Sequence, residues 1–424
     1  MKSLPLIGQG SETNILTEDA VRQLLKKAFA SAPVDNRRLL VIIPDLTRSA
    51  PIPLFFRLLN EVLGDRVARL DYLIALGTHQ PLSEAAIAKL VGMSSVARAR
   101  RYPKSEVYNH HWDDTNALQV VGTISSAEMS ELTGGLVDRE TPINLNRMIH
   151  DYDELLILGP VFPHEVAGFS GGAKYLFPGI AGREIIDSTH WLGALATSYD
   201  TIGVKDTAVR RVLHHGARFV TDHMPVTCLK LVMKGNAFHG LYIGDHLSAW
   251  EAAADLSAKL NITYKSRPFR SVLSLPSEKY DDLWTAAKAM YKTEPVIADG
   301  GEVIIYAPHI RDISVTHGPL IEAVGYHVRD YFLGQWESFK DIAWTVLAHS
   351  THVKGAGSYE GGREHPRIQV TLATSIPREV CEKVNLGYRD PHTLDPSVWA
   401  DREAEGLLLV PNAGEVLYRL EGSV

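Results

Sequence analysis

The feature that most constrains the fold is a repeated order of apolar segment, polar loop and helical segment. Arg38–Pro44 is a short apolar run, and it leads through a polar loop into the helix-like Leu54–Leu63. The same order returns in Arg69–Leu76, a polar loop and the helical Glu84–Val91. Short apolar runs bounded by charge and proline are typical of buried parallel strands. The repetition therefore predicts an α/β fold with mainly parallel sheets.

The rest of the chain extends this pattern. Further strands are predicted at Asp153–Pro160, Ala217–Met224, Leu229–Lys234, Arg270–Leu275, Glu302–Ala307, Trp344–Ala348, Arg367–Ala373 and Gly406–Val410, and helices at Leu247–Leu260, Trp284–Tyr291 and Leu320–Phe332. We expect two α/β domains, a cofactor-binding and catalytic domain at 1–268 and a substrate-clamping domain at 269–424, whose last segment is free to pack back on the first. A cleft between two such domains is a common place for a small ligand, so we expect the active site there.

Composition excludes several classes of protein. The 424 residues are 45% hydrophobic and 22% charged, with a net charge of −7, which gives no electrostatic reason for a nucleic acid or membrane partner. Cys228 and Cys381 are too few for a disulfide framework or a cysteine zinc site. The N-terminus lacks the apolar run of a signal peptide, and no stretch approaches the roughly 20 apolar residues of a spanning helix. These observations predict a cytoplasmic protein.

The segment from His164 to His190 has the densest chemistry in the chain. It places His164, Lys174 and His190 among five glycines in an apolar setting. Histidine can bind a metal or transfer protons, and lysine can contact phosphate or act as a nucleophile. The glycine run before Lys174 lacks the spacing and the Ser/Thr of a P-loop, and His164-Glu165 does not continue as the zinc motif H-E-x-x-H.

Polar residues also follow the first two predicted strands, namely Asp45, Thr47, Arg48, Ser49 and His79. The carboxyl ends of parallel strands are where α/β sheets bind ligands. We expect Thr47 or Ser49 to cap the following helix, and Arg48 to offer a fork for a carboxylate or phosphate. If the sheet is parallel, His79 and His164 lie at one edge and can form an acid/base pair.

Three other groups of polar residues have both a structural and a functional interpretation. His110 and His111 in the Asn109–Asp114 segment favour a structural turn over a metal site, because adjacent histidines point in different directions. Thr285 and Lys288 share a helix face, either as solvated residues or as a carboxylate clamp. The polar segments His309–Gly318, with His309 and His317, and His349–His352 are either surface loops or the wall of a polar pocket.

Together these motifs resemble the nickel-dependent lactate racemase family, whose members carry a nickel-pincer nucleotide. The resemblance covers most of the chain and is densest in Asp45-Leu-Thr-Arg48, Gly77-Thr-His79 and the His164, Lys174, His190 trio. It implies that Lys174 carries the cofactor covalently and that His190 is the nickel ligand from the protein. It also implies that cofactor-maturation proteins are partners.

The resemblance further implies a mechanism. His79 and His164 match the family's acid/base pair, Arg48 its oxygen-polarising arginine and Lys288 its carboxylate lysine. A 2-hydroxy acid would lose hydride to the pincer ring, pass through a 2-keto acid and regain hydride on the other face. The remaining contacts expected with the cofactor are Asp45, Thr47, Ser170, Gly171 and Gly172, and those expected with the substrate are Arg48, Trp284, Thr285, Lys288, His309 and His317.

One difference from lactate racemase itself bears on the substrate. A tyrosine-glutamine pair precedes the carboxylate lysine there, and Trp284 and Thr285 stand at those positions here. The shorter Thr285 and the histidine loops favour a larger, more polar acid, such as an aldonic sugar acid inverted at C2. The alternatives are a lactate or other short-chain racemase, a transferase that binds nucleotide phosphate through Arg48 and the glycines, and a non-catalytic cofactor-binding relative.

Overall fold

The computed structural model describes residues 4–423, which separate into two compact units. Unit 1 comprises Met1–Phe162, Phe169–Ile186 and Arg210–Leu260, and unit 2 comprises Pro163–Gly168, Asp187–Val209 and Asn261–Val424. The chain passes from one unit to the other inside helix α6 (Arg183–Leu195) and near the start of helix α8 (Ala208–Thr221). Neither unit is therefore one continuous stretch of sequence.

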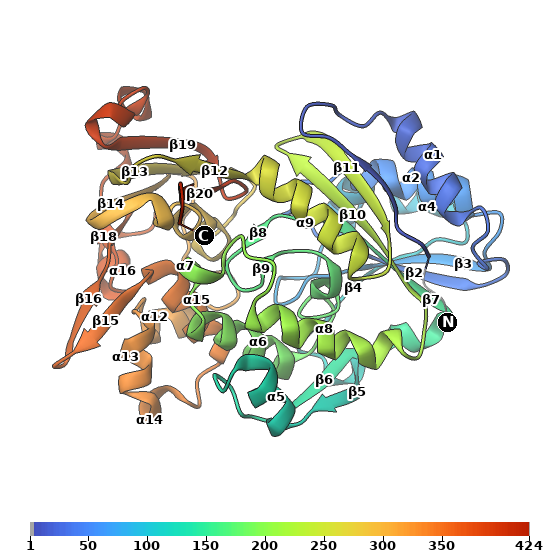
Figure 1. Ribbon diagram of the computed structural model, residues 1–424, viewed down its shortest axis with the longest axis horizontal. Helices are drawn as coiled ribbons and strands as arrows, with labels where there is room; N and C mark the ends of the chain where they lie inside the picture. The colour runs from blue at the N-terminus through green and yellow to red at the C-terminus, as the bar shows by residue number, and fades with distance from the viewer. Residues whose placement is uncertain (1–3, 424) are drawn as a thin grey trace. The chain divides into compact units, whose positions relative to one another are not determined.

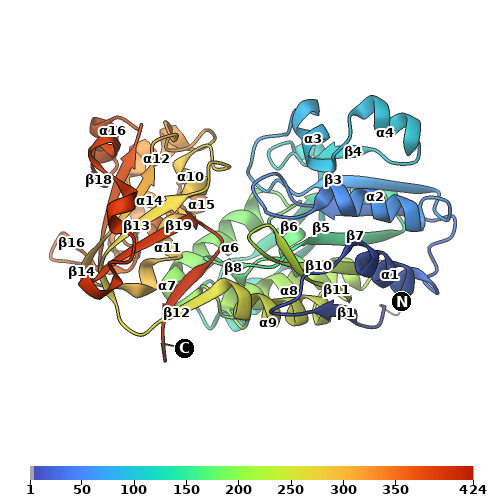
Figure 2. The same cartoon turned by 90° about the horizontal axis from the view of Figure 1, so that it is seen from above.

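Unit 1 is built on a seven-stranded sheet in the order β1, β11, β10, β7, β2, β3, β4, of which Figure 2 labels all but β2. The strands are β1 (Ile7–Gly10), β2 (Arg38–Ile43), β3 (Arg69–Ile74), β4 (Val107–Asn109), β7 (Glu154–Pro160), β10 (Val226–Lys234) and β11 (Ala237–Gly244). β2, β3, β4, β7 and β10 run parallel, and β11 pairs antiparallel with β10 and β1. The sheet is thus mainly parallel, as predicted.

The two faces of this sheet differ in chemistry. On one face, alternate residues such as Val41, Leu156 and Leu229 pack in one apolar core with helices α1 (Glu18–Phe29) and α2 (Ile52–Leu63). The residues between them point to the other face, where Cys228 and Lys230 are both fully buried. A charged residue in the middle of a buried strand is unusual.

Smaller elements complete unit 1. They are α3 (Glu84–Val91), α4 (Ser95–Arg101), the antiparallel pair β5 (Leu118–Ile124) and β6 (Thr141–Asn146), α5 (Ser126–Thr133), β9 (Gly168–Phe169, shared with unit 2) and α9 (Ser248–Asn261). A 3-10 helix at Gly172–Tyr175 carries Lys174.

Unit 2 contains a five-stranded parallel sheet in the order β18, β17, β14, β13, β19, of which Figure 1 labels all but β17. Its strands are β13 (Phe269–Pro276), β14 (Ile297–Ala307), β17 (Gln369–Thr374), β18 (Gly387–Tyr388) and β19 (Leu407–Ala413). Two further pairs are β12 (Ile262–Lys265) with β20 (Leu417–Leu420), which is parallel, and β15 (Gly357–Glu360) with β16 (Arg363–Pro366), which is antiparallel; β8 (Pro163–His164) also belongs to this unit.

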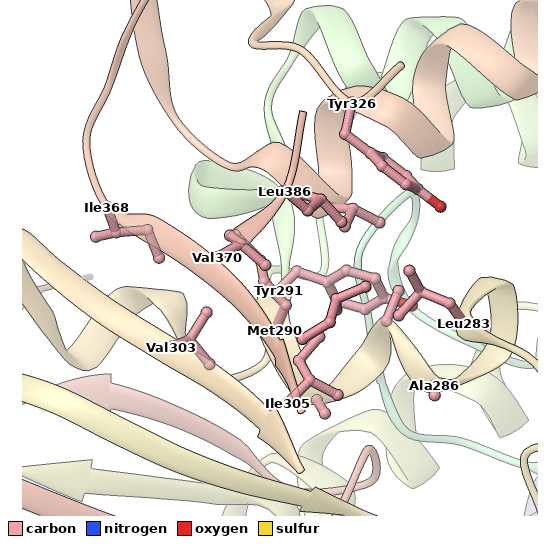
Figure 3. Close-up of a cluster of buried hydrophobic side chains, with 14 of the residues drawn as sticks. Leu283, Ala286, Met290, Tyr291, Val303, Ile305, Tyr326, Ile368, Val370 and Leu386 are labelled. Carbon is pink, nitrogen blue, oxygen red and sulfur yellow. The ribbon is translucent and has the colours of Figure 1, made fainter. Parts of the chain in front are cut away.

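Short helices surround the core of unit 2. They are α7 (Ser198–Thr201), α10 (Leu283–Ala286), α11 (Lys288–Tyr291), α12 (Gly318–Val324), α13 (Arg329–Gly334), α14 (Trp336–Phe339), α15 (Trp344–Lys354) and α16 (Arg378–Lys383). Figure 3 shows part of this core, where Leu283 of α10 and Met290 of α11 meet Val303 and Ile305 of β14. Trp191 and Ile202, which precede the sheet by many residues, are buried in the same core.

Two predicted strands are wrong, because both segments are helical. Ala217–Met224 falls largely in α8, whose buried Val209, Val212, Leu213 and Val220 repeat at helical spacing over a window longer than the one predicted. Trp344–Ala348 begins α15, in which Thr345–Val353 are all buried. A helix buried on every side has no polar stripe, so its period is not visible in the sequence.

Two predicted helices are interrupted. Leu320–Phe332 divides into α12 and α13 because Gly325 ends the first with a φ of +79°. Trp284–Tyr291 divides into the single turns α10 and α11 on either side of Ala287. Within residues 4–423, no helix is both long enough and apolar enough to cross a membrane.

Candidate functional site

The loops that follow β2 and β3 meet in unit 1. Nδ1 of His79 lies 2.5 Å from Oδ2 of Asp45, a carboxylate that is only 6% exposed. The other carboxylate oxygen, Oδ1, accepts hydrogen bonds from Thr47, from the hydroxyl at 2.6 Å and from the backbone amide at 3.0 Å. The neighbouring parallel strands bring these loops together, as the sequence predicted for this edge of the sheet.

Electrostatics keep the Asp45 carboxyl ionised. Burial by itself raises its pKa, but the charge of His79 and the hydrogen bonds from His79 and Thr47 outweigh burial, with help from Arg48, and hold the pKa well below its ordinary value. The carboxylate therefore accepts the Nδ1–H of His79. In the neutral form of this half-buried imidazole, Nε2 therefore carries the lone pair and is the nitrogen that can accept a proton.

The predicted helix cap in this loop is wrong. The N-cap position of α2 is occupied by Pro51, which makes no side-chain cap hydrogen bond. The Thr47 hydroxyl lies four residues before Pro51 and donates to Asp45. The loop is therefore organised around the carboxylate rather than around the helix end.

The glycine segment of unit 1 is fixed by packing and by hydrogen bonds. Gly171 and Gly172 have φ values of +82° and +61°, and a Cβ on Gly172 would lie 3.0 Å from the Trp250 side chain. The buried guanidinium of Arg210 donates to the carbonyls of Gly171 and Phe169. These contacts explain the two glycines, and their predicted contact with a cofactor stays a prediction.

Ser170 is part of the same framework. Its hydroxyl donates to the carbonyl of Pro160 at 3.3 Å and accepts the amide of Phe162 at 2.9 Å. Trp250 donates its indole N–H to the Ser170 carbonyl at 2.9 Å. The half-buried Lys174 follows four residues later, so these hydrogen bonds fix the backbone that leads to it.

His164 and His190 belong to unit 2. His164 is 5% exposed, and Oε2 of Glu165 lies 3.3 Å from its Nδ1. When the ring is neutral, Nδ1 accepts the Val166 amide at 3.2 Å. His190 is half-buried in α6, and its charge is among those that lower the pKa of His349.

Trp284 lies in a ring cluster that also contains His317, Tyr326, His349 and His352. The Trp284 ring stacks on His349 at a centroid distance of 3.9 Å and meets His317 at 4.5 Å. Tyr326 packs edge-on against His349 at 5.8 Å. Nε2 of His349, Nε2 of His352 and the Tyr326 hydroxyl are buried without a hydrogen-bond partner in the described part of the chain.

Burial determines the charge state of this ring cluster. It lowers the pKa of His349 well below the ordinary value, and the neighbouring imidazoles of His352 and His317 lower it further, because protonation of more than one ring would bring like charges together. It also lowers the pKa of His352 to about 4. Both imidazoles are therefore neutral at physiological pH and can each offer one donor and one acceptor.

Lys288 is held beside this cluster. It is 7% exposed, donates to the carbonyl of Thr285 at 3.0 Å and lies 4.8 Å from the ring centroid of Tyr280. Asp282 caps the turn by accepting the Thr285 amide at 3.0 Å, and it also accepts the amide of Val315 at 3.1 Å. The proximity of Thr285 and Lys288 predicted from their spacing is thus present.

The other predicted polar residues have different surroundings. His309 is exposed in the turn after β14. His110 is buried between the carbonyl of Ala181 at 3.0 Å and the amide of Asn146 at 3.1 Å, so the structural reading of that segment holds. No group of three or more metal-binding side chains occurs among residues 4–423.

Several residues of these sites were either missed in the sequence or assigned to the wrong kind of element. His349 and His352 were expected in a loop, but they lie three residues apart on α15. Glu165 is adjacent to His164 in sequence and was considered only as part of a zinc motif. The buried Lys230 did carry a signal, because it interrupts an otherwise apolar strand.

Known proteins give the context for this geometry. Residues 9–203 match the family model of the lactate racemase N-terminal domain. The lactate racemase of Thermoanaerobacterium thermosaccharolyticum is 23% identical over 70% of this chain and 67% of its own length. That of Lactiplantibacillus plantarum is 23% identical over 64% of this chain and 60% of its own length.

Solved structures extend the likeness to nearly the whole chain. A crystal structure of a Thermotoga maritima protein superimposes with a TM-score of 0.89 at 32% identity, over 97% of this chain and 100% of the other. The lactate racemase apoprotein of T. thermosaccharolyticum has a TM-score of 0.70 at 17% identity, over 98% and 94% of the two chains, and so shares the fold. Residues 9–203 therefore form a lactate racemase N-terminal domain, and the chain as a whole is similar to lactate racemases in sequence and shares their fold.

Proposed function

We propose that the protein is a racemase or epimerase that inverts C2 of a 2-hydroxy acid with a nickel-pincer nucleotide. The observation that carries the proposal is the Asp45–His79 pair, at a strand-end position where the family resemblance expects a proton-transferring histidine. Glu165 beside Nδ1 of His164 repeats the arrangement at the second expected histidine. The lactate racemase name of two relatives supports the reaction class.

The residues of this chain fit the proposed cofactor in chemistry. Lys174 supplies a primary amine on a rigid segment, and His190 supplies an imidazole, which is a good ligand for nickel. The buried amine of Lys230, which has no hydrogen-bond partner in residues 4–423, is close to Tyr175 and so to the tether. We propose that Lys174 and His190 hold the cofactor, which supplies a reversible hydride acceptor when bound.

His79 is the proposed base for one stereoisomer. Its Nε2 takes the hydroxyl proton of the substrate, and the imidazolium that forms is stabilised by Asp45 through Nδ1–H. The carboxylate also prevents the ring from turning, so the same nitrogen always faces the substrate. Asp45 is thus a positioning residue for His79.

His164 is the proposed partner for the other stereoisomer. Glu165 stabilises its imidazolium at 3.3 Å, while the Val166 amide favours its neutral form by donating to Nδ1. When Nδ1–H is directed at Glu165 the ring exchanges its proton at Nε2, whereas in the tautomer that accepts the Val166 amide at Nδ1 the proton stays on Nε2. Inversion needs this exchange, because each direction of the reaction begins with one histidine neutral and the other protonated.

Arg48 and Lys288 are the proposed electrostatic contacts with the substrate. The guanidinium polarises the C2 oxygen as it gains carbonyl character, and the ammonium holds the carboxylate. Lys288 is suited to this because burial and the carbonyl of Thr285 fix its direction. A planar keto acid held at its carboxylate can then be reduced on either face.

We further propose that the substrate is larger and more polar than lactate. Thr285 is shorter than the glutamine of lactate racemase, and the ring cluster beside Lys288 contains three buried polar atoms without hydrogen-bond partners in the described residues. Each such atom costs about 1–3 kcal/mol when left unsatisfied, so hydroxyl groups of a ligand would be favoured there. An aldonic sugar acid has such hydroxyls.

The cofactor proposal is tested by intact mass and metal analysis. Protein made together with the cofactor-maturation proteins should carry an adduct and one nickel, and Lys174→Arg should carry neither. An unmodified mass in both samples would refute the racemase and favour a phosphate-binding transferase. Full loading without turnover of any 2-hydroxy acid would indicate a non-catalytic relative.

The substrate proposal needs a panel of acids in D₂O with the loaded enzyme. NMR should show epimerisation of gluconate-type acids with a kcat/KM at least tenfold above that of lactate. A preference for lactate would refute the larger substrate and leave the short-chain racemase standing.

A further inference from the structure

One aspartate of helix α6 caps helix α15 of the same unit. Asp187, with which α6 enters unit 2, accepts two hydrogen bonds at Oδ1 from Thr345, one from the hydroxyl at 2.6 Å and one from the backbone amide at 2.9 Å. Thr345 is the second residue of α15, and Ala343, which precedes this helix, makes no side-chain cap hydrogen bond. The Asp187 carboxylate therefore takes the place of the missing cap, although it belongs to another helix.

Packing holds the same half of α6 in unit 2. The Trp191 ring stacks on Trp336 at a centroid distance of 5.4 Å and meets Trp344, the first residue of α15, at 6.5 Å. At the end of α6, Arg329 donates to the carbonyl of Leu195 at 3.0 Å. This half of the helix is therefore fixed at its middle and at its end as well as at its beginning.

The Asp187–Thr345 contact lies one turn before an imidazole on each of the two helices. On α6, His190 follows Asp187 by three residues. On α15, His349 follows Thr345 by four, and side chains at either spacing share a helix face. Burial lowers the pKa of His349, and the nearness of His190 adds to this shift. The contact therefore fixes the distance between the two helical turns that carry these neighbouring imidazoles.

We propose that Asp187 is a positioning residue for His190, and this inference rests on the proposed function, which assigns the nickel to that imidazole. Asp187 acts through the position of its helix and makes no bond to the metal. A metal ligand must be held within about 0.5 Å of its productive position. A looser turn of α6 should therefore weaken the bond from His190 without affecting the covalent tether at Lys174.

The test compares nickel release from wild type and Asp187→Ala, each made as the full chain together with the cofactor-maturation proteins. After a chelator is added, the remaining nickel is followed over time by elemental analysis, and the adduct mass is measured on the same samples. The alanine variant should release nickel at least about tenfold faster with its adduct intact, since residues that orient metal ligands contribute about 10–100-fold to metal affinity. Asp187→Asn keeps an acceptor oxygen for Thr345 and should stay within about threefold of wild type.

Two measurements separate this role from a loss of stability. Ser125→Ala removes the cap of α5 in unit 1 and is the matched control, for which nickel release should be unchanged. Hydrogen exchange of the cofactor-free chain should be faster for peptides from 187–195 and 344–354 in Asp187→Ala, but not in the asparagine variant. Unchanged exchange in the alanine variant would contradict the contact between the helices.

The remaining outcomes are equally decisive. Equal nickel release by wild type and Asp187→Ala would overturn the positioning role, as would equally fast release by the Ser125→Ala control. Thr345→Val removes one of the two hydrogen bonds; it replaces the alanine variant if that variant does not fold, and it should release nickel about threefold faster than wild type. Wild type that carries neither adduct nor nickel would instead refute the proposed function, so the two failures are distinguishable.

Discussion

The pairing of His79 with Asp45 has a direct kinetic consequence at the scale of single residues. Asp45→Asn keeps the shape of the side chain but removes the charge that stabilises the imidazolium, so we expect kcat of the loaded enzyme to fall by about 100-fold or more. Thr47→Val, which removes one hydrogen bond to the same carboxylate, should cost less than about tenfold. An asparagine variant that kept half of the wild-type kcat would contradict the positioning role.

His164 should be separable from cofactor loading. His164→Ala is expected to retain the adduct and the nickel but to lose turnover by at least about 100-fold, since general acid/base catalysis contributes roughly 10²–10⁴-fold. Intact mass, metal analysis and a racemisation assay on one sample make the comparison. Wild-type turnover by the alanine variant would remove His164 from the proton-transfer pair.

His110 should make stability depend on pH. Burial lowers its pKa to about 4, so below the ordinary value of 6.5 the unfolded chain binds a proton that the folded chain excludes. The free energy of unfolding therefore decreases as the pH falls from about 6.5 to about 4. The loss that His110 causes by pH 5 is about 2 kcal/mol. Urea unfolding of wild type and His110→Gln at pH 7 and 5 measures it, and the variant should lose less stability by about that amount. An equal loss would contradict the shift.

Some contacts between single residues could be predicted from the sequence and others could not. The separation of Asp45 and His79 by a strand and a helix made their meeting predictable, because the ends of adjacent parallel strands are close in space. The contact of Trp284 with His349 was not predictable, since it joins residues 65 positions apart through packing that no local pattern records. Lys230 was read only as part of a strand, although its charge conflicts with the burial of that strand.

Among the elements, the turn that carries Lys288 makes a specific prediction. Asp282 fixes both Thr285 and the Val315 amide, so Asp282→Ala should reduce stability by about 1–2 kcal/mol and raise KM several-fold more than it lowers kcat. Ser83→Ala removes the cap of α3 in unit 1 and is the matched control, with a loss of stability but an unchanged KM. An unchanged KM for Asp282→Ala would show that the cap does not set the position of Lys288.

Elements with a simple environment were predictable, and the others were not. β2 and β3 are buried on both faces and read as apolar runs, and α3 has a capping serine at Ser83 and a glycine at its end. By contrast, α15 is buried on all sides, and its histidines resemble a polar loop. The burial of an element, rather than the secondary-structure propensity of its residues, determined whether it could be predicted from the sequence.

For the whole molecule, the discontinuous path of unit 2 can be tested by dissection. A fragment of residues 269–424 lacks Trp191 and Ile202, which are buried in the unit 2 core, with Trp191 stacked on Trp336 at 5.4 Å. We expect this fragment to unfold in urea without a cooperative transition. A fragment of residues 261–424 joined through a flexible linker to residues 187–209 should recover a cooperative transition. Cooperative unfolding of the 269–424 fragment alone would refute the proposal that the unit 2 core needs Trp191 and Ile202.

The same discontinuity affects the order in which the protein is made. Trp191 and Ile202 leave the ribosome about 200 residues before β19 (Leu407–Ala413), an outer strand of the sheet in their unit. At roughly 5–20 residues per second, this delay is of the order of 10–40 s. During synthesis the tryptophan segment must therefore wait for its partners, so the nascent chain should engage a chaperone at residues 187–209 before it engages one anywhere in the later strands.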